Sequence, residues 1–463
     1  MPDVRVDQHA LQGNILAGYA FRHALFVTLH VTNPDAGRNW LGEVMDANAI
    51  TTAVPFGDTK PASTINVAFT HDGLRALGVS HEALRSFPLD FQQGMAARAG
   101  LIGDDGADGP PRWEAGLRPG DPHVLVTLSA NEPEALAEQR AAIESRAGAK
   151  GSGVQIVHEQ AASVIEDAAR ETVAREHFGF ADGLAQPSIA GVAAHDPKRP
   201  VGPTRREGQG TPVRGGWKPL AVGEFVLGYA DEAGVVADTP VEPLRRSGSY
   251  MVVRKLRQNV ALFHHYLMNA AGGDEDEARL LAAKIVGRWQ DGTPIVKCPE
   301  PPDASQSAGE PDNDFRYSGD QYGLHCPVGA HIRRANPRDA LGFSGRLTAR
   351  HRMIRRGMPY GPPPANPAVE GGIERGLMFV CYQASIERQF EVVQGRWLAD
   401  GDAFGLGEDR DFLLGGEDPN GKMIIQGSRP RFLAPRRSFV VNRGGGYFFA
   451  PGIRALNAIA HGV

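Results

Sequence analysis

The fold is decided by the first β-α-β run of the chain, whose opening strand reads Ala24-Leu25-Phe26-Val27-Thr28-Leu29-His30-Val31. Its apolar and β-branched residues predict a strand. Residues 33–35 mark a turn, residues 38–47 place apolar side chains on one helical face, and residues 64–70 alternate like a second strand. This order predicts a sheet that is covered by helices.

The same order returns before the middle of the chain. A polar, Gly-rich interval at residues 102–120 is expected to run over the surface. Beyond it, residues 123–129 predict a strand, residues 131–146 a helix with a proline in its first turn, and residues 154–157 a further strand. Two β-α-β runs separated by an insertion are typical of a split βαβ, or ferredoxin-like, unit with an antiparallel sheet.

The second half of the chain repeats this layout. We therefore predict an α+β protein made of two ferredoxin-like halves with antiparallel sheets, at residues 1–215 and 216–463. Two segments, at 195–220 and 299–319, are rich in proline and polar residues and predict a crossing loop and a surface excursion. The elements predicted in this half are a strand at 249–256, helices at 259–269 and 275–289, a strand at 377–384, a helix at 386–397 and a closing strand pair at 439–449.

Composition places the chain among soluble globular proteins. Of its 463 residues, 41% are hydrophobic and 22% are charged, and 49 basic against 54 acidic residues give a formal charge of −5. These values indicate neither a nucleic-acid nor a membrane partner. There is no run of 18 apolar residues, residues 1–7 lack the layout of a signal peptide, and the three cysteines are scattered. We therefore expect a cytoplasmic protein.

The stretch best suited to chemistry surrounds His331. It reads Cys326-Pro327-Val328-Gly329-Ala330-His331-Ile332-Arg333-Arg334-Ala335-Asn336-Pro337-Arg338, and arginines return in Arg352-Met353-Ile354-Arg355-Arg356-Gly357. Small residues before His331 would leave space for a flat group, and arginines on both sides would hold anions. A haem with two propionates suits this pattern, although a purely structural histidine is also compatible with it.

Two other kinds of metal site fit this stretch less well. The chain has no Cys-x-x-Cys-His, which excludes covalent c-type haem attachment. A zinc site made of His325, Cys326 and His331 would lack a fourth ligand at any usual spacing.

A second candidate lies in the first half, where the chain reads His177-Phe178-Gly179-Phe180-Ala181-Asp182-Gly183-Leu184-Ala185-Gln186-Pro187. An aspartate among aromatic residues and glycines would be partly desolvated, which suits acid–base chemistry. Asp-Gly is also a common turn dipeptide, so a turn aspartate is the simpler interpretation of this motif by itself.

Taken together, the two stretches resemble the dye-decolourising peroxidase family. Gly179-Phe180-Ala181-Asp182-Gly183 matches the Gly-x-x-Asp-Gly signature of the family, and residues 326–338 are similar to its proximal-histidine segment. The resemblance covers nearly the whole chain, because further stretches match in family order at residues 11–16, 223–229, 249–258, 355–361 and 376–383.

The resemblance implies one haem b, held between sheet and helices of two ferredoxin-like halves. His331 would be the axial iron ligand, Asp182 the distal acid–base group and Arg355 the distal arginine. The other residues expected to hold or line the haem are Arg338 at a propionate, Leu377 and Phe379 as an apolar distal wall, Gly183 and Gln186 beside the distal aspartate, and Asp411 as acceptor of the His331 N–H, with Asp418 as an alternative.

The implied reaction is the reduction of hydrogen peroxide to water, coupled to the oxidation of dyes, phenols or other aromatic one-electron donors. Asp182 would relay a proton, and Arg355 would stabilise the negative charge that develops on the peroxide. Dyes too bulky for a closed pocket would need surface aromatic residues. By residue type alone the candidates are Trp113, Trp217, Trp289, Trp397 and Tyr382, although packing is the simpler role for each.

Two further classes of protein stay open at this point. A haem storage or transfer protein would need His331 but neither Asp182 nor Arg355. A non-haem α+β protein that binds another small ligand would leave the arginines and the Gly-x-x-Asp-Gly motif unexplained. A Soret band would distinguish the haem proteins from the non-haem protein, and peroxide turnover would distinguish a peroxidase from a haem carrier. An oligomer is compatible with any of them.

Overall fold

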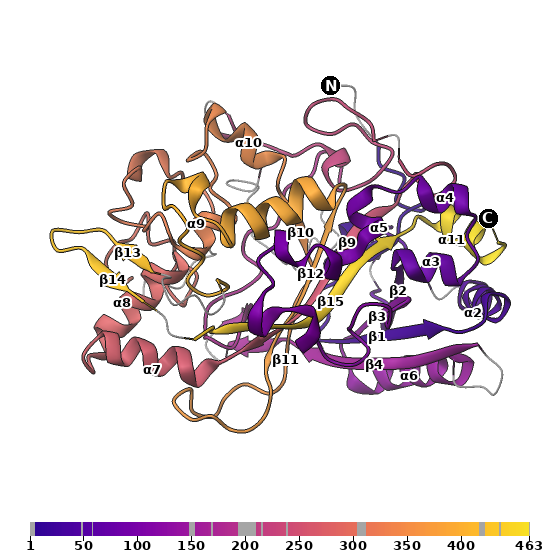
Figure 1. The fold of residues 1–463 in the computed structure, drawn as a ribbon, viewed down its shortest axis with the longest axis horizontal. Coiled ribbons are helices and arrows are strands. Elements are labelled where there is room, and N and C mark those ends of the chain that lie inside the picture. The colour runs from indigo at the N-terminus through magenta and orange to yellow at the C-terminus, as the bar shows by residue number, and fades with distance from the viewer. Residues whose placement is uncertain are drawn as a thin grey trace.

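The computed structural model describes residues 5–47, 50–57, 59–147, 153–167, 170–192, 210–213, 216–237, 239–302, 312–415, 422–434 and 437–462. Within these ranges the molecule is built on one antiparallel sheet of nine strands, in the order β10-β12-β9-β15-β2-β3-β1-β4, with β11 also paired to β12. Figure 1 shows the sheet crossing the centre, with α2, α3 and α6 on one side of the molecule and α7, α8 and α9 on the other.

The N-terminal half has the predicted split βαβ order. Neighbouring strands β4, β1, β3 and β2 are all antiparallel, which is the ferredoxin-like arrangement. The elements of this half are β1 (His23–Val31), α2 (Pro34–Asp46), β2 (Ser63–Phe69), β3 (Val124–Ala130), α6 (Pro133–Ala147) and β4 (Val154–Ser163).

The C-terminal half repeats this order, and the prediction of two ferredoxin-like halves is confirmed. Its strands are not a separate sheet, however, because β15 pairs with β2 at Phe449 and Phe69 and joins the halves edge to edge. The elements are β9 (Ser249–Gln258), α7 (Val260–Ala270), α8 (Glu275–Val286), β10 (Ile354–Arg355), β11 (Met358–Tyr360), β12 (Gly376–Gln383), η7 (Ile386–Leu398, a π-helix) and β15 (Val440–Ala450).

Shorter elements surround the sheet. The short helices are α1 (Gly13–Leu16), α3 (His71–Ala76), α4 (His81–Arg85), α5 (Leu89–Ala97), α9 (His331–Ala335), α10 (Arg346–Ala349) and α11 (Ile453–Ala460). The 3₁₀ turns are η1 (Ala99–Leu101), η2 (Gly106–Asp108), η3 (Pro110–Arg112), η4 (Val222–Glu224), η5 (Ser318–Asp320), η6 (Phe343–Gly345) and η8 (Asp402–Phe404). Three hairpins pair β5 (Ile165–Asp167) with β6 (Arg170–Arg175), β7 (Thr211–Val213) with β8 (Gly216–Lys218), and β13 (Met423–Ile425) with β14 (Arg431–Leu433).

Capping residues explain where helices begin and end. The side chain of Asn33 accepts the N–H of Ala36 and Pro34 is the first helical residue, so α2 starts four residues earlier than the apolar pattern predicted. Asp274 caps α8 in the same way, and Gly287, with φ of 101°, ends it in a left-handed conformation. The sequence prediction had continued this helix to residue 289.

The interval at residues 102–120 is only partly the predicted surface excursion, because exposed residues alternate there with buried ones. Trp113 is 1% exposed and lies in the main core cluster beside the sheet. Two buried acids tie the interval to the C-terminal strands, because Asp104 pairs with Arg254 of β9 and Asp108 accepts the backbone N–H of Asn442 in β15. Partners 150 or more residues away compensate the burial of these polar groups.

Three other predictions need correction or lie partly outside the described residues. Residues 440–450 form one strand with a register shift between Asn442 and Gly445, not a strand pair that turns at the glycines. In the predicted surface segment 299–319, Phe315 and Tyr317 are buried. Of the predicted crossing loop at 195–220, residues 195–209 and 214–215 lie outside the described part. Among the helices of the described ranges, none has the length and apolar character needed to cross a membrane.

Candidate functional site

His331 is the first residue of α9 and points its Nδ1 atom at a buried carboxylate. Nδ1 lies 3.1 Å from Oδ2 of Asp411, the contact expected from the sequence. The backbone N–H groups of Leu413 and Leu414 bond to the other carboxylate oxygen at 3.0 and 2.9 Å, which fixes the orientation of the acid. With Nδ1 acting as the donor, the lone pair of Nε2 is left for a metal. The alternative partner, Asp418, lies outside the described residues.

Each of these two groups shifts the pKa of the other. Burial by itself would raise the pKa of Asp411, but the charge and hydrogen bond of His331, together with the charge of Arg334, keep that pKa below its ordinary value. Burial would likewise lower the pKa of His331, yet the Asp411 carboxylate outweighs burial and raises it. The imidazole therefore has an anionic partner that increases its electron density.

The arginines next to His331 bind groups of the chain itself, and the expected carboxylate partner is present only for Arg333, which pairs with Asp320 at 3.3 Å. Arg334 is almost fully buried and donates to the backbone oxygens of residues 397, 398, 400 and 409, so it fixes the end of η7 and the start of the Asp411 loop. Arg333 bonds to the backbone of Asp320 and Cys326. Beside Gly329, a Cβ would lie in ordinary contact with Met423, at 3.5 Å.

Asp182 is carried by a tight loop that follows β6. The carboxylate of Glu176 accepts the N–H groups of Phe178 and Phe180, each at 2.9 Å, and the Asp182 N–H bonds to the oxygen of Ala174 at 2.8 Å. The Asp182 side chain is half-buried and accepts the N–H of Gly183. Both the turn geometry and the partial burial expected for Asp182 are therefore present.

Glycine has a definite role at position 183. Its φ is +77°, a conformation that side chains disfavour, and a Cβ built on it meets no atom within 4 Å. Open space therefore lies directly beside Asp182, where a flat group could approach the backbone.

Gln186 joins the Asp182 segment to Arg355. Its side-chain nitrogen donates to the Arg355 oxygen at 2.9 Å, and its side-chain oxygen accepts the Arg355 N–H at 3.0 Å. The Arg355 guanidinium also reaches the backbone oxygen of Ala185, at 3.4 Å. Its charge acts on His331, because it is one of the influences that lower the pKa of that imidazole.

Arg355 and its neighbour Arg356 have different roles. Arg356 donates to the backbone oxygens of Asn14 and Leu16 and so ties the N-terminal segment to β10. Arg355 is the member of the pair that keeps its guanidinium largely free for the site. The two predicted wall residues, Leu377 and Phe379, alternate on β12 and are only partly buried, although they pack against the apolar cluster around α7 and α8.

Arg338 and Arg352 supply further buried positive charge. Arg338 donates to the oxygens of Asn313 and Phe315 and lies 3.7 Å above the Phe315 ring. Arg352 was missed by the sequence prediction. Its printed hydrogen bond is a long one to the oxygen of Ala185, at 3.4 Å, and burial together with the charges of Arg338 and Arg355 lowers its pKa to about 9. Its place three residues before Arg355, in the same quoted stretch, was the available signal.

Buried arginines without an acidic partner are costly unless an anion joins them. The charges that act on Arg352 are two other arginines, and no carboxylate is among them. A haem would supply propionates here and an iron atom for Nε2 of His331, so the residues fit that group. The class of protein that this fold and site define is an α+β haem protein.

Comparison with known proteins gives the family. Residues 10–164 match the model described as "DyP dimeric alpha+beta barrel domain", and residues 230–405 match "Dyp-type peroxidase, C-terminal". The chain is 30% identical to dye-decolorizing peroxidase AauDyP1 of Auricularia auricula-judae, over 96% of this chain and 85% of that protein. It is also 30% identical to the multifunctional dye peroxidase DyP2 of an Amycolatopsis species, over 87% of this chain and 83% of that protein.

The structural comparison agrees. A solved dye-decolorizing peroxidase in complex with 2,6-dimethoxyphenol superimposes with a TM-score of 0.80 at 26% identity, covering 98% of this chain and 100% of the other. The chain belongs to the dye-decolourising peroxidase family, and it is a haem-dependent peroxidase.

The five aromatic residues considered for electron transfer are placed very differently. Trp113, Trp289, Trp397 and Tyr382 are buried, so a bulky donor cannot contact any of them directly. Trp217 in β8 keeps part of its surface exposed, and its indole N–H donates to the Asp314 carboxylate at 2.7 Å.

Proposed function

We propose that this peroxidase reduces hydrogen peroxide to water with one haem b ligated by His331, and that dyes, phenols or similar aromatic molecules supply the electrons. The observation that carries the proposal is the clamp formed by Gln186, which holds the Asp182 segment and Arg355 together while the charge of Arg355 acts on His331. These contacts support a site in which Asp182 carries a proton, Arg355 supplies a positive charge and His331 supplies a metal-ligating nitrogen.

The haem, when bound, supplies an iron centre that accepts oxidising equivalents from peroxide. Asp182 is the residue that moves the proton. Its half-buried carboxylate accepts a proton from one peroxide oxygen and returns it to the other, so that water can leave. The hydrogen bond from Gly183 and the bond from its own N–H to Ala174 hold the carboxylate in place during this transfer.

Arg355 stabilises the negative charge that develops on the peroxide. Its backbone is fixed by Gln186 before substrate arrives, so little reorganisation is needed at the moment of reaction. Asp411 keeps the proton of His331 on Nδ1, so that the lone pair of Nε2 would be available to the haem iron. We propose both Asp182 and Arg355 as catalytic without ordering them.

The remaining contacts follow from charge and space. Arg352 and Arg338 are proposed to hold the propionates. Both are buried cations, and the charges of Arg338 and Arg355 act on Arg352. Leu377 and Phe379 would form an apolar wall of the haem site, and the open space at Gly183 would leave room for the haem beside the backbone. Gln186 contributes to haem binding indirectly, because it holds the backbone of Arg355 in place.

We also propose a reducing, cytoplasmic location. Cys298, Cys326 and Cys381 are all free thiols, and the last two are buried. The names of the relatives support dyes as electron donors, and the 2,6-dimethoxyphenol complex of a similar structure supports phenols.

The decisive experiment mixes haem-loaded protein with stoichiometric peroxide and follows the Soret band by stopped flow. Asp182→Asn and Arg355→Leu should slow the peroxide-dependent change by about 10²-fold or more, as expected for loss of a positioned acid–base or charge-stabilising group. His331→Ala should abolish it. Arg346→Leu, which removes an exposed arginine on α10, is the matched control and should react like the wild type.

The experiment also distinguishes a peroxidase from the alternative, a haem storage or transfer protein. That protein would bind haem through His331 but would react with peroxide slowly, and at one rate in every variant that retains His331. Such a result would replace the peroxidase proposal.

A further inference from the structure

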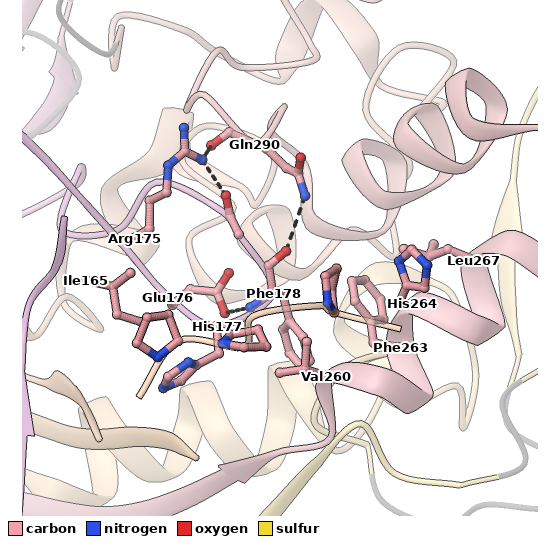
Figure 2. Close-up of a pocket in the computed structure, with 14 residues that line it drawn as sticks. Ile165, Arg175, Glu176, His177, Phe178, Val260, Phe263, His264, Leu267 and Gln290 are labelled. Carbon is pink, nitrogen blue, oxygen red and sulfur yellow. Dashed lines mark hydrogen bonds between the residues drawn. The ribbon is translucent and has the colours of Figure 1, made fainter. Parts of the chain in front are cut away.

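A partly open cavity lies beside residues 175–179, in the segment that leads to Asp182. Its volume is about 280 Å³, and it is lined by these residues, helix α7 and the proline-rich loop that follows β11 (Figure 2). Its apolar wall includes Phe178, Val260, Phe263 and Leu267. An apolar cavity of about 150 Å³ is enough to take up benzene, so this one has room for a single substituted aromatic ring.

The cavity also has polar groups at its edge. Glu176, His264 and Gln290 line it together with the apolar residues (Figure 2). Gln290 is engaged with the Phe178 oxygen, and Glu176 with the backbone N–H groups of its own loop. The imidazole of His264 is half-buried and, among the residues that the structure describes, it forms no hydrogen bond. A convergent polar group in an apolar pocket is what orients a small ligand.

A chain of aromatic contacts leads from this cavity to the proximal side of the site. Phe178 and Phe263, which line the cavity, have ring centroids 4.6 Å apart. Phe263 is 5.2 Å from Phe439, and Phe439 is 5.7 Å from Phe412. Phe412 follows directly after Asp411, the residue that bonds to His331. The rings are therefore in unbroken contact from the cavity wall to the carboxylate behind the proximal histidine.

We infer that this cavity binds a small phenol as an electron donor, and that the Phe178–Phe263–Phe439–Phe412 chain is the medium through which its electron reaches the proximal side of the haem. This inference rests on the proposed function and names a donor site for it. The apolar wall contacts the ring, and His264 accepts the hydroxyl proton.

The step is balanced. The phenol O–H bond breaks, its proton goes to the His264 imidazole, and one electron goes to the enzyme that peroxide has oxidised. The product is a neutral phenoxyl radical, which leaves the cavity. Two phenols are consumed for each hydrogen peroxide, which is reduced to two waters.

Binding is tested without turnover, on ferric haem-loaded protein in the absence of peroxide. Isothermal titration with 2-methoxyphenol should show one site in the wild type. His264→Trp places a larger ring at the cavity and should weaken binding at least 10-fold. His265→Trp is the matched control, because His265 is its exposed neighbour and does not line the cavity, and its affinity should stay within about twofold of the wild type.

Two further variants complete the test. Leu267→Phe fills the cavity from its wall and should reproduce the loss of binding if His264→Trp does not fold. Phe439→Leu should leave phenol binding unchanged but slow single-turnover electron transfer from bound phenol several-fold. The inference is overturned if phenol binds equally well to His264→Trp, Leu267→Phe and the wild type, or if Phe439→Leu transfers electrons at the wild-type rate.

The experiments distinguish an error in the donor-site inference from an error in the proposed function. If peroxide changes the Soret band normally while the cavity variants bind phenol like the wild type, only the donor site is wrong. If peroxide causes no rapid change in the wild type, the proposed function is wrong, and the calorimetric result on the cavity can still be read.

Discussion

Replacing Asp411 by asparagine would separate the charge of this residue from its shape. One carboxylate oxygen accepts the N–H groups of Leu413 and Leu414, and the other faces Nδ1 of His331. Asparagine has only one oxygen, and two backbone donors outweigh one imidazole donor. We therefore expect the oxygen to stay with the backbone and the amide nitrogen to face His331. The ring proton must then move to Nε2, the atom that should bind iron.

The expected loss follows from the bond that is removed. A hydrogen bond to a charged group contributes about 1.5–3 kcal/mol, and about 1.4 kcal/mol corresponds to a factor of ten. Haem affinity should therefore fall by about 10- to 100-fold, which agrees with the effect typical of residues behind a metal ligand. The assay titrates haem-free protein with haem and follows the Soret band, and the ferric spectrum reports whether the axial imidazole is bound.

Asp409→Asn is the matched control for this experiment. Asp409 is also buried and lies two residues away, but its carboxylate pairs with Lys422 at 3.1 Å. Its affinity for haem should stay within about twofold of the wild type. An Asp411→Asn protein with wild-type affinity and spectrum would refute the reasoning about the tautomer. Equal losses in both variants would refute it too, because general destabilisation would then explain them.

Three more predictions concern charge, pH and electron entry. Arg352→Leu removes a buried cation on which only other arginines act, so it should raise the melting temperature of the haem-free protein. The same change should lower haem affinity about 10-fold. Calorimetry and haem titration measure the two effects, and a change of both quantities in the same direction would contradict the prediction. Burial raises the pKa of Glu176 from its ordinary 4.5 to about 7, so its contribution to stability is complete below pH 4.5 and is lost as pH rises toward 7. Denaturant titrations should show the stability of wild type falling relative to Glu176→Gln across that window, and parallel curves would exclude the effect. Trp217→Phe should slow oxidation of a bulky dye several-fold but not of a small phenol in steady-state assays, and equal losses would exclude Trp217 as an entry point.

The sequence predicted elements whose causes are local. The strand of residues 23–31 follows from its apolar and β-branched content, α6 begins at Pro133, and α8 follows from apolar periodicity and its cap Asp274. The prediction from the sequence failed where a segment's burial depends on residues far away in the chain. Residues 102–120 look like a surface loop, yet Arg254 and Asn442 make the burial of their acids possible. No periodicity within the interval could reveal those partners.

In the candidate site too, the sequence predicted what depends on local motifs and missed what depends on distant parts of the chain. His331, Asp182 and Arg355 were identified because they lie in recognisable motifs. The motif that contains His331 also suggested that Arg333 and Arg334 bind an anion. Arg334 donates to backbone oxygens instead, and Arg333 pairs with the Asp320 carboxylate of its own chain. An arginine in a sequence has the same charge in either role. Its partner is decided by which loops fold over it, and that is a property of the tertiary structure.

Gln186 illustrates why the geometry of the site depends on such long-range contacts. Its amide offers one donor and one acceptor, which is what a neighbouring strand would offer to the backbone of Arg355. The side chain thus extends the pairing of β10, which is only two residues long, across to the Asp182 loop. Because the contact uses backbone atoms of Arg355, it fixes the position from which the guanidinium projects without occupying the guanidinium itself. The segments that carry Asp182 and Arg355 are therefore joined directly, although 173 positions separate these two residues in the sequence.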